Sequence, residues 1–331
     1  MGRLANLIGL VALLAVPMLG VSDYVLHLGI TILIWGFVYT AWSLMGRFGL
    51  VSLGHGAFLG IGAYTVTMLW NHAGISPWLG IPVAVALAVL VAVLIGYPCF
   101  RFRITGHYFA LVTLALGEIV LMLIVALRDW TGGSLGVTPA SALSADVSFS
   151  LVALQVSSKG VFFYVAVGLW LLGLWVWKRV DSSMARYALE AANEQEDAAA
   201  SVGVDVTRTK LTITVLSAAL TALGGIAYGQ YQLYINPETV SGIAKSLEIV
   251  FAVIAGGMYV RLGPTFGAAF TLLLAEGLRV AFGHDVHGLD GTIYGLMLVI
   301  FIIFMPEGIL GRLARLWETR RAPTSPRTAS A

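Results

Sequence analysis

Glu118 and His55 are the side chains best placed for chemistry in an apolar environment, because each stands within a long run of apolar residues. A carboxylate at the depth of a bilayer is costly, so Glu118 must face the protein interior and either find a partner or take up a proton. His55 could be a polar element of a solute path or a hydrogen-bonding group that joins two helices. The sequence leaves both alternatives open for each residue.

No constellation for catalysis or cofactor binding accompanies these two residues. The sequence contains no GxxxxGK[ST] loop for ATP phosphates and no HExxH zinc motif. Cys99 is the only cysteine, so neither an intrachain disulfide nor a cysteine-built metal site can form within the chain. We therefore predict no catalytic residue, no metal site and no cofactor bound by this chain, and we expect a protein that is not an enzyme.

The composition indicates a membrane protein. Apolar residues make up 59% of the chain and charged residues 11%, against roughly 25% charged residues in an ordinary soluble domain. Long apolar runs recur from end to end, so the lipid bilayer is the expected solvent and lipid an expected partner. The net charge of +2 gives no basic excess for binding nucleic acid.

Ten segments are apolar enough to cross a bilayer as helices, which need about 20 residues each. They lie near residues 4–21, 24–45, 49–70, 80–100, 107–127, 160–178, 211–233, 247–260, 264–282 and 290–305. The predicted fold is therefore an all-α integral membrane protein. Most Lys and Arg residues then fall in cytoplasmic loops, and the positive-inside rule places both termini in the cytoplasm. Ten crossings could form two five-helix halves of opposite topology, because an odd number of crossings reverses direction.

These spans belong to a single predicted transmembrane domain, residues 1–317. An external loop near 128–159 is rich in Gly, Ser and Thr, and a charged cytoplasmic loop lies near 179–210. Residues 318–331 show no apolar periodicity, so we expect a disordered cytoplasmic tail.

Two membrane segments, residues 49–64 and 246–270, contain many glycines. The spacing of Gly56 and Gly60 lets helix backbones approach closely, which could serve packing alone. The segments could instead be broken helices beside a solute path, since irregular backbone at membrane depth persists only inside protein or beside water. The candidate path residues are Ser52, Gly54, His55, Gly56, Tyr108, Thr113, Glu118, Gly256 and Gly257.

The cytoplasmic loop is acidic and rich in alanine, so it cannot enter the membrane. We predict that Asp197 caps a short helix over 198–202, which ends at Gly203 in the left-handed conformation, and that Asp205 caps the helix of the seventh span. Such a compact projection could fit the groove of a partner protein, or the loop could simply be solvated.

Taken together, these segments resemble the membrane-spanning permease subunits of ABC importers for branched-chain amino acids. The likeness covers roughly residues 30–312. It is carried, in the family's order, by GLVSLGHGAFLGIGAYT (49–65), YFALVTLALGEI (108–119) followed by TGGSLGV, AAASVGVDVTRTKL (198–211), AGG with LGPTFGAA (255–269), and MPEGILGRL (305–313). The resemblance implies a bacterial inner-membrane importer for branched-chain amino acids or closely related small polar solutes.

The resemblance also implies partners: a second homologous permease subunit, two cytoplasmic ATPase subunits that use the ATP, and an extracytoplasmic substrate-binding protein. The loop seated in an ATPase groove would contain Glu194, Asp197, Ala198, Ala199, Ala200, Gly203 and Val204. The sequence departs from the family pattern in two places. The loop is acidic at Glu194, Glu196 and Asp197 and has Glu190 where a basic residue is expected, and Tyr259 stands where a small residue is common. The alternative function is a stand-alone secondary transporter or channel in which Glu118 carries a proton or a cation.

Overall fold

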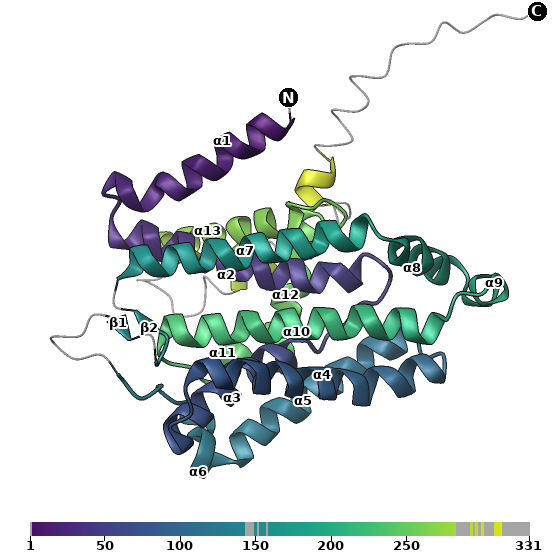
Figure 1. Ribbon diagram of the computed structural model, residues 1–331, viewed down its shortest axis with the longest axis horizontal. Coiled ribbons are helices and arrows are strands. Elements are labelled where there is room, and N and C mark those ends of the chain that lie inside the picture. The colour runs from purple at the N-terminus through teal and green to yellow at the C-terminus, as the bar shows by residue number, and fades with distance from the viewer. Residues whose placement is uncertain are drawn as a thin grey trace, which may run out of the picture.

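The computed structural model describes residues 2–142, 149–150, 152–156, 158–282 and short stretches at 292–293, 295–296, 299–300 and 308–312. The described chain is built almost entirely of helices (Figure 1). Its elements are α1 (Gly2–Ala15), η1 (Val16–Leu19), α2 (Asp23–Gly46), α3 (His55–Ala73), α4 (Pro77–Arg101), α5 (Gly106–Ala126), α6 (Arg128–Thr131), η2 (Gly133–Leu135), β1 (Phe149–Ser150), β2 (Gln155–Val156), α7 (Lys159–Asp181), α8 (Met184–Glu194), α9 (Glu196–Ser201), α10 (Val206–Gln232), α11 (Pro237–Val240), α12 (Gly242–Gly256) and α13 (Gly263–Phe282).

The structure confirms the all-helical class. Within the described residues, 6 helical segments are long and apolar enough to cross a bilayer: Asp23–Gly46, Pro77–Arg101, Gly106–Ala126, Lys159–Asp181, Val206–Gln232 and Pro237–Gly256. The predicted spans near 4–21, 49–70 and 264–282 also contain helices, namely α1 with η1, α3 and α13. The predicted span 290–305 and the predicted tail 318–331 lie largely or wholly outside the described residues. The count of ten crossings and the two inverted halves therefore stay predictions.

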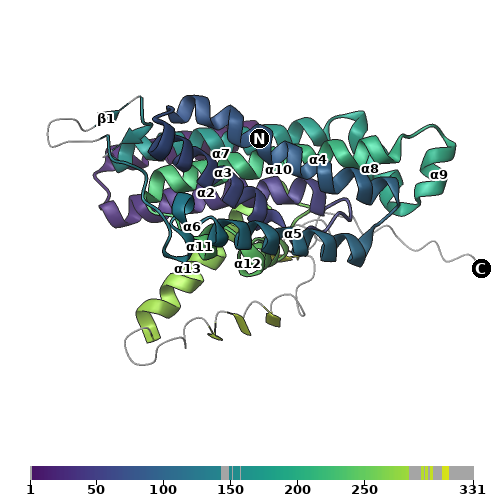
Figure 2. The ribbon, with the colours of Figure 1, turned by 90° about the horizontal axis from the view of Figure 1, so that it is seen from below.

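Helix α2 lies at the centre of the bundle. In its most apolar window 78% of the residues are buried, against 28% in α4. Helix α4 is also apolar on every side but keeps a broad exposed face of residues such as Leu87 and Leu94, as suits a helix that faces lipid. Helices α7, α10 and α13 pack along α2, and α10 also packs along α3 and α4. Figure 2 shows α13 leaving the bundle at an oblique angle.

Glycines allow α3 and α10 to pack backbone against backbone. A Cβ atom added at Gly62 would overlap the carbonyl oxygen of Ala222, and one added at Gly225 would overlap the carbonyl oxygen of Leu59. Gly60 likewise faces Ser241. Of the two predicted glycines, Gly56 lies against backbone, because a Cβ atom there would be 2.8 Å from the carbonyl oxygen of Gly242, whereas Gly60 faces a side chain. Helices with small residues at their contacts associate closely in membranes.

The predicted helix over 49–70 begins later than expected. Gly49 has a φ of 75°, and residues 50–54 are not helical, so α3 starts at His55. The glycine-rich sequence left a broken helix open but did not locate the break, because side chains of other helices hold it. The Nε1–H group of Trp42 donates to the carbonyl oxygen of Ser52 at 2.8 Å, and the Leu53 amide donates to Thr113 Oγ1 at 3.0 Å.

The external loop is partly ordered by hydrogen bonds to α3. It contains α6, η2 and the antiparallel pair β1–β2, a small departure from a purely helical fold. The Asn71 side chain donates to the carbonyl oxygen of Thr138 at 3.0 Å and accepts from the amide of Ala140 at 2.7 Å. Residues 143–148 of this loop lie outside the described residues.

Candidate functional site

Helices α3, α5 and α12 meet at a point that we call the three-helix junction, formed by the first turns of α3 and α12 against the middle of α5. The Glu118 carboxylate accepts a hydrogen bond from the backbone N–H of Ile243 at 3.0 Å. Ser246 Oγ accepts from the backbone N–H of Gly56 at 3.0 Å and donates to the carbonyl oxygen of Gly242 at 2.9 Å. The first amides of a helix have no partner within it, and these contacts satisfy one such amide in each of α3 and α12. Glu118 also lies at the positive end of the α12 dipole.

His55 links three helices through a buried chain of hydrogen bonds. Its side chain is fully buried; Nε2 lies 2.8 Å from Ser217 Oγ and Nδ1 lies 3.1 Å from Ser52 Oγ. The Ser217 hydroxyl donates to the carbonyl oxygen of Ala41 at 2.7 Å, so its oxygen accepts from His55 Nε2–H. This arrangement assigns the hydrogen to Nε2, and His55 joins α3 to α2 and α10.

Gly54 sits where the chain passes closest to α5. A Cβ atom at this position would overlap the carbonyl oxygen of Thr113. Thr113 itself accepts from the Leu53 amide and donates to the carbonyl oxygen of Ala110 at 2.9 Å. The non-helical entry to α3 is therefore pinned against α5 by both backbone and side chain.

The candidate path residues fall into separate groups in the structure. The junction and its surroundings bring together Ser52, Gly54, His55, Gly56, Thr113 and Glu118. Tyr108 lies near the start of α5, and its side chain is 75% exposed. Gly256 and Gly257 lie at the α12–α13 turn, where a Cβ atom at Gly256 would overlap the carbonyl oxygen of Gly263.

The junction is tightly packed in this conformation. Ser52, His55 and Thr113 are all buried, and the cavity beside Ser52 and Thr113 has a volume of only about 10 Å³. That volume is at the lower limit for a single water molecule. A solute of amino acid size therefore cannot reach His55 without movement of the helices, whereas Glu118 is partly exposed.

An ion pair within α12 was not among the sequence-predicted residues. Lys245 Nζ lies 2.6 Å from Glu248 Oε2 and 4.6 Å from the centroid of the Trp35 ring. The sequence does contain a signal for this pair, because Lys245 and Glu248 are opposite charges three residues apart within an apolar segment. The pair and the cation–π contact together allow a charged lysine to pack against α2.

We call α8 and α9 together the coupling segment; it extends beyond the bundle at the end opposite to β1 and β2 (Figure 1). Lys210, which is buried at the start of α10, pairs with Glu196 of α9. Arg103, in the turn between α4 and α5, pairs with Asp197 at 2.6 Å, although both side chains are largely exposed. These contacts join the segment to α10 and to the corner between α4 and α5.

One of the predicted caps in this segment is wrong. Helix α9 begins at Glu196 rather than at Ala198, and its N-cap is Gln195, so Asp197 lies inside the helix and pairs with Arg103 instead. An acidic residue in the first turn of a helix is itself favourable, because it lies at the positive end of the helix dipole. The predicted cap at Asp205 is confirmed, because its side chain accepts from the Arg208 amide at 2.9 Å.

Gly203 ends α9 in the predicted left-handed conformation, with a φ of 93°. The Gly203 amide donates to the carbonyl oxygen of Ala200 at 3.0 Å, and the Val204 amide to that of Ala199 at 3.1 Å. These two bonds form a Schellman motif, which satisfies carbonyl groups at a helix end. Ala199 is buried, whereas Ala198 and Ala200 face outward with Val202, which is 79% exposed.

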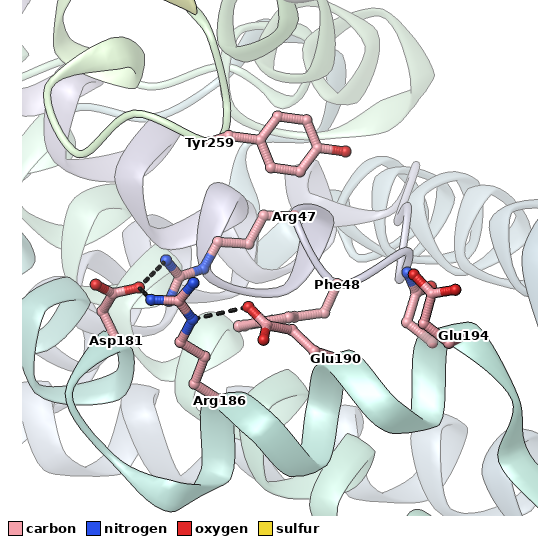
Figure 3. Close-up of a pocket in the computed structure, with 8 residues that line it drawn as sticks. Arg47, Phe48, Asp181, Arg186, Glu190, Glu194 and Tyr259 are labelled. Carbon is pink, nitrogen blue, oxygen red and sulfur yellow. Dashed lines mark hydrogen bonds and ion pairs between the residues drawn. The ribbon is translucent and has the colours of Figure 1, made fainter. Parts of the chain in front are cut away.

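A cluster of charged residues holds α8 against the bundle (Figure 3). Asp181 Oδ1 lies 3.1 Å from Arg47 Nη1 and 3.2 Å from Arg186 Nη1, and Arg186 Nε lies 2.7 Å from Glu190 Oε1. Burial lowers the pKa of Arg47, and the neighbouring Asp181 opposes that shift. The hydrogen bond with Glu190 raises the pKa of Arg186.

Comparison with known proteins gives a consistent match. The family model described as the permease component of the branched-chain amino acid transport system matches residues 5–304. The high-affinity branched-chain amino acid transport system permease protein LivM of Escherichia coli K12 is 32% identical over 288 residues, and LivM of Salmonella typhimurium is 31% identical over 287. Each alignment covers 81% of this chain and 65% of the relative.

A more distant relative is the probable branched-chain amino acid transport permease protein LivH of Methanocaldococcus jannaschii. It is 26% identical over 277 residues, which are 80% of this chain and 85% of the relative. The chain thus spans 65% of the length of the LivM proteins and a larger part of this LivH protein. No solved structure matches the chain.

Proposed function

Because this chain belongs to the permease-component family of branched-chain amino acid transport systems, we propose that it is the permease subunit of an ATP-driven ABC importer. It forms the translocation path for branched-chain amino acids or closely related small polar solutes. It spans the bacterial inner membrane several times, with both termini in the cytoplasm. Two cytoplasmic ATPase subunits use the ATP, and an extracytoplasmic substrate-binding protein delivers the solute.

The coupling segment is the observation that carries this proposal. It is a compact helical projection, joined to the ends of several helices through Lys210–Glu196, Arg103–Asp197 and Arg47–Asp181–Arg186. A displacement of its exposed tip by a partner would therefore be transmitted to α2, α5, α7 and α10 together. In this proposal an ATPase groove receives the face that carries Ala198, Ala200, Val202 and Gly203, with Glu194 and Val204 beside it.

The path in this proposal runs between this chain and a second homologous permease subunit. Helix α5 has an exposed stripe at Tyr108, Leu111, Ile119 and Met122, beside the partly exposed Glu118. Ser52, Gly54, His55, Gly56 and Thr113 support the wall of the path from behind, and Gly256 and Gly257 shape the turn at the far end of α12. The contact between the first turns of α3 and α12, which occupy matching places in the two proposed halves, supports an inverted repeat.

The hydrogen bond between Glu118 and the start of α12 favours this proposal over a stand-alone transporter or channel. In that alternative, Glu118 would have to release a proton or a cation during each cycle. A carboxylate that accepts a backbone amide at a helix N-terminus already has a structural partner.

Affinity purification of the tagged chain from its native membrane tests the proposal. We expect two ATPase subunits and a homologous permease to copurify. The purified chain alone, reconstituted in liposomes with a gradient of leucine, should show no flux. Flux through the chain without an ATPase would overturn the importer and favour the stand-alone transporter.

A further inference from the structure

A polar pocket of about 350 Å³ lies between the coupling segment and the bundle (Figure 3). Arg47 lines it from the corner between α2 and α3, and Asp181 from the end of α7. Helix α8 contributes Arg186, Glu190 and Glu194, and Tyr259 closes it from the α12–α13 turn. Its volume lies in the range of about 300–1,000 Å³ that is usual for small-molecule sites.

The Arg47 side of the pocket has too few hydrogen-bond acceptors. The Arg47 side chain is only 6% exposed. Its guanidinium lies 4.6 Å from the centroid of the Phe48 ring and 4.1 Å from that of Trp177, but its Nε and Nη2 atoms are buried without a hydrogen-bond partner. The one acceptor that it has, Asp181 Oδ1, is shared with Arg186. A buried charged donor without an acceptor is costly, so these atoms call for water or a bound group that accepts hydrogen bonds. A ligand that binds on this side of the pocket would therefore present oxygen acceptors.

The α8 side of the pocket is acidic. Glu190 and Glu194 lie one helical turn apart, and Glu190 is engaged by Arg186. Among the described residues, Glu194 has no ion-pair partner. Glu190 and Tyr259 line this same pocket although they are far apart in the sequence.

We propose that the pocket binds a free α-amino acid in its zwitterionic form. The carboxylate accepts hydrogen bonds from Arg47, and the ammonium group donates to Glu194. The apolar side chain lies against the rings of Tyr259 and Phe48. Because the ligand would connect α8 to the α2–α3 corner and to the α12–α13 turn, it restrains the coupling segment. Under the proposed function, on which this consequence rests, imported amino acid slows its own import from the cytoplasmic side.

Equilibrium binding of tritiated L-leucine to the purified transporter, in nanodiscs and without the substrate-binding protein, tests the site. We expect saturable binding. As competitors, 4-methylpentanoate, which lacks the ammonium group, and 3-methylbutylamine, which lacks the carboxylate, should each be about tenfold weaker than leucine or worse, since each loses hydrogen bonds to a charged group.

Two variants localise the binding. Arg47→Lys and Glu194→Gln should each weaken leucine binding about tenfold. The matched control Glu238→Gln alters an exposed carboxylate in α11, outside the pocket, and should leave binding unchanged. Glu194 is exposed, so its variant keeps the test valid if Arg47→Lys fails to fold. Binding that both folded pocket variants retain would overturn the assignment.

Different experimental results would overturn the pocket and the proposed importer function. A complex that contains the ATPases but binds no leucine at millimolar concentration overturns the pocket and leaves the importer intact. A chain that purifies without ATPases and still binds leucine through Arg47 and Glu194 supports the pocket and overturns the importer.

Discussion

Glu118 of α5 and Ile243 of α12 are 125 residues apart in the sequence, yet the carboxylate of one accepts the backbone amide of the other at 3.0 Å. The start of α12 has no side-chain cap of its own, because Ser241 makes no capping bond. Glu118 therefore caps α12 from a different helix. The position of this helix start in the bundle depends on α5.

Substitution of Glu118 separates this structural role from proton or cation transport. Glu118→Gln keeps an oxygen acceptor for Ile243, so stability and uptake should remain close to those of the unmodified protein. Glu118→Ala removes the cap and should lower the free energy of unfolding by about 1–2 kcal/mol. Thermal unfolding in detergent and leucine uptake by the assembled transporter measure both effects. A folded Glu118→Gln variant without uptake would instead favour the carrier role.

His55 should act mainly through its bond to Ser217. His55→Gln can still donate to Ser217 Oγ, whereas His55→Leu leaves buried hydroxyl groups without their partner and should cost about 1–3 kcal/mol of stability. Ser217→Ala removes the same bond from the other side. In a double-mutant cycle of His55→Leu with Ser217→Ala, the combined loss should be smaller than the sum of the two single losses, because both remove one interaction. Additive losses would contradict the proposed link.

The features that the sequence predicts well are those set by neighbouring residues. Apolar runs locate the helices, Asp205 caps α10 as predicted, and Gly203 adopts the left-handed conformation as predicted. The features that the sequence does not predict depend on distant partners. The glycines of the segment near 49–70 left open whether its helix is broken, and the sequence alone could not place the break at residues 52–53, which Trp42 and Thr113 hold in a non-helical conformation.

The contacts of charged residues are likewise not predicted from the sequence when their partners are distant in the chain. Asp197 has the residue type of a helix cap, but it lies inside α9 and pairs with Arg103, a residue that no local pattern connects to it. The sequence places Glu118 and His55 in membrane segments and leaves open what they contact. Their partners, Ile243 and Ser217, come from helices whose position no local pattern reveals.

Because α3 packs closely on α10, alanine substitutions of glycines at this contact should lower protein stability much more than an alanine substitution of a glycine elsewhere. Gly62→Ala and Gly225→Ala each place a methyl group against a backbone carbonyl oxygen of the opposite helix, which cannot move without shifting that helix. Each should destabilise the protein by about 1–3 kcal/mol. Gly168→Ala in α7 is the matched control, because a Cβ atom there meets nothing within 4 Å. It should be neutral or slightly stabilising, since alanine favours a helix over glycine. Equal unfolding temperatures for the three variants would contradict the packing argument.

The last prediction concerns Gly203 at the tip of the coupling segment. A substitution there changes the backbone conformation without producing steric overlap. A Cβ atom at Gly203 meets nothing within 4 Å, but the φ of 93° disfavours any residue with a branched side chain. Gly203→Val should therefore disrupt the Schellman motif at a local cost of about 1–3 kcal/mol and displace the exposed Val202. Under the proposed function, ATP-dependent uptake should fall strongly while the amount of protein in the membrane stays unchanged.

Gly203→Asn is the matched control for this change. Asparagine also adds a side chain at the tip, but it tolerates the left-handed region far better than valine does. Uptake by the asparagine variant should therefore remain close to that of the unmodified transporter. Loss of uptake in both variants would mean that any side chain at this position blocks the partner's groove. Normal uptake in both would contradict a coupling role for the segment, because a displaced tip could not then transmit the closure of the ATPases.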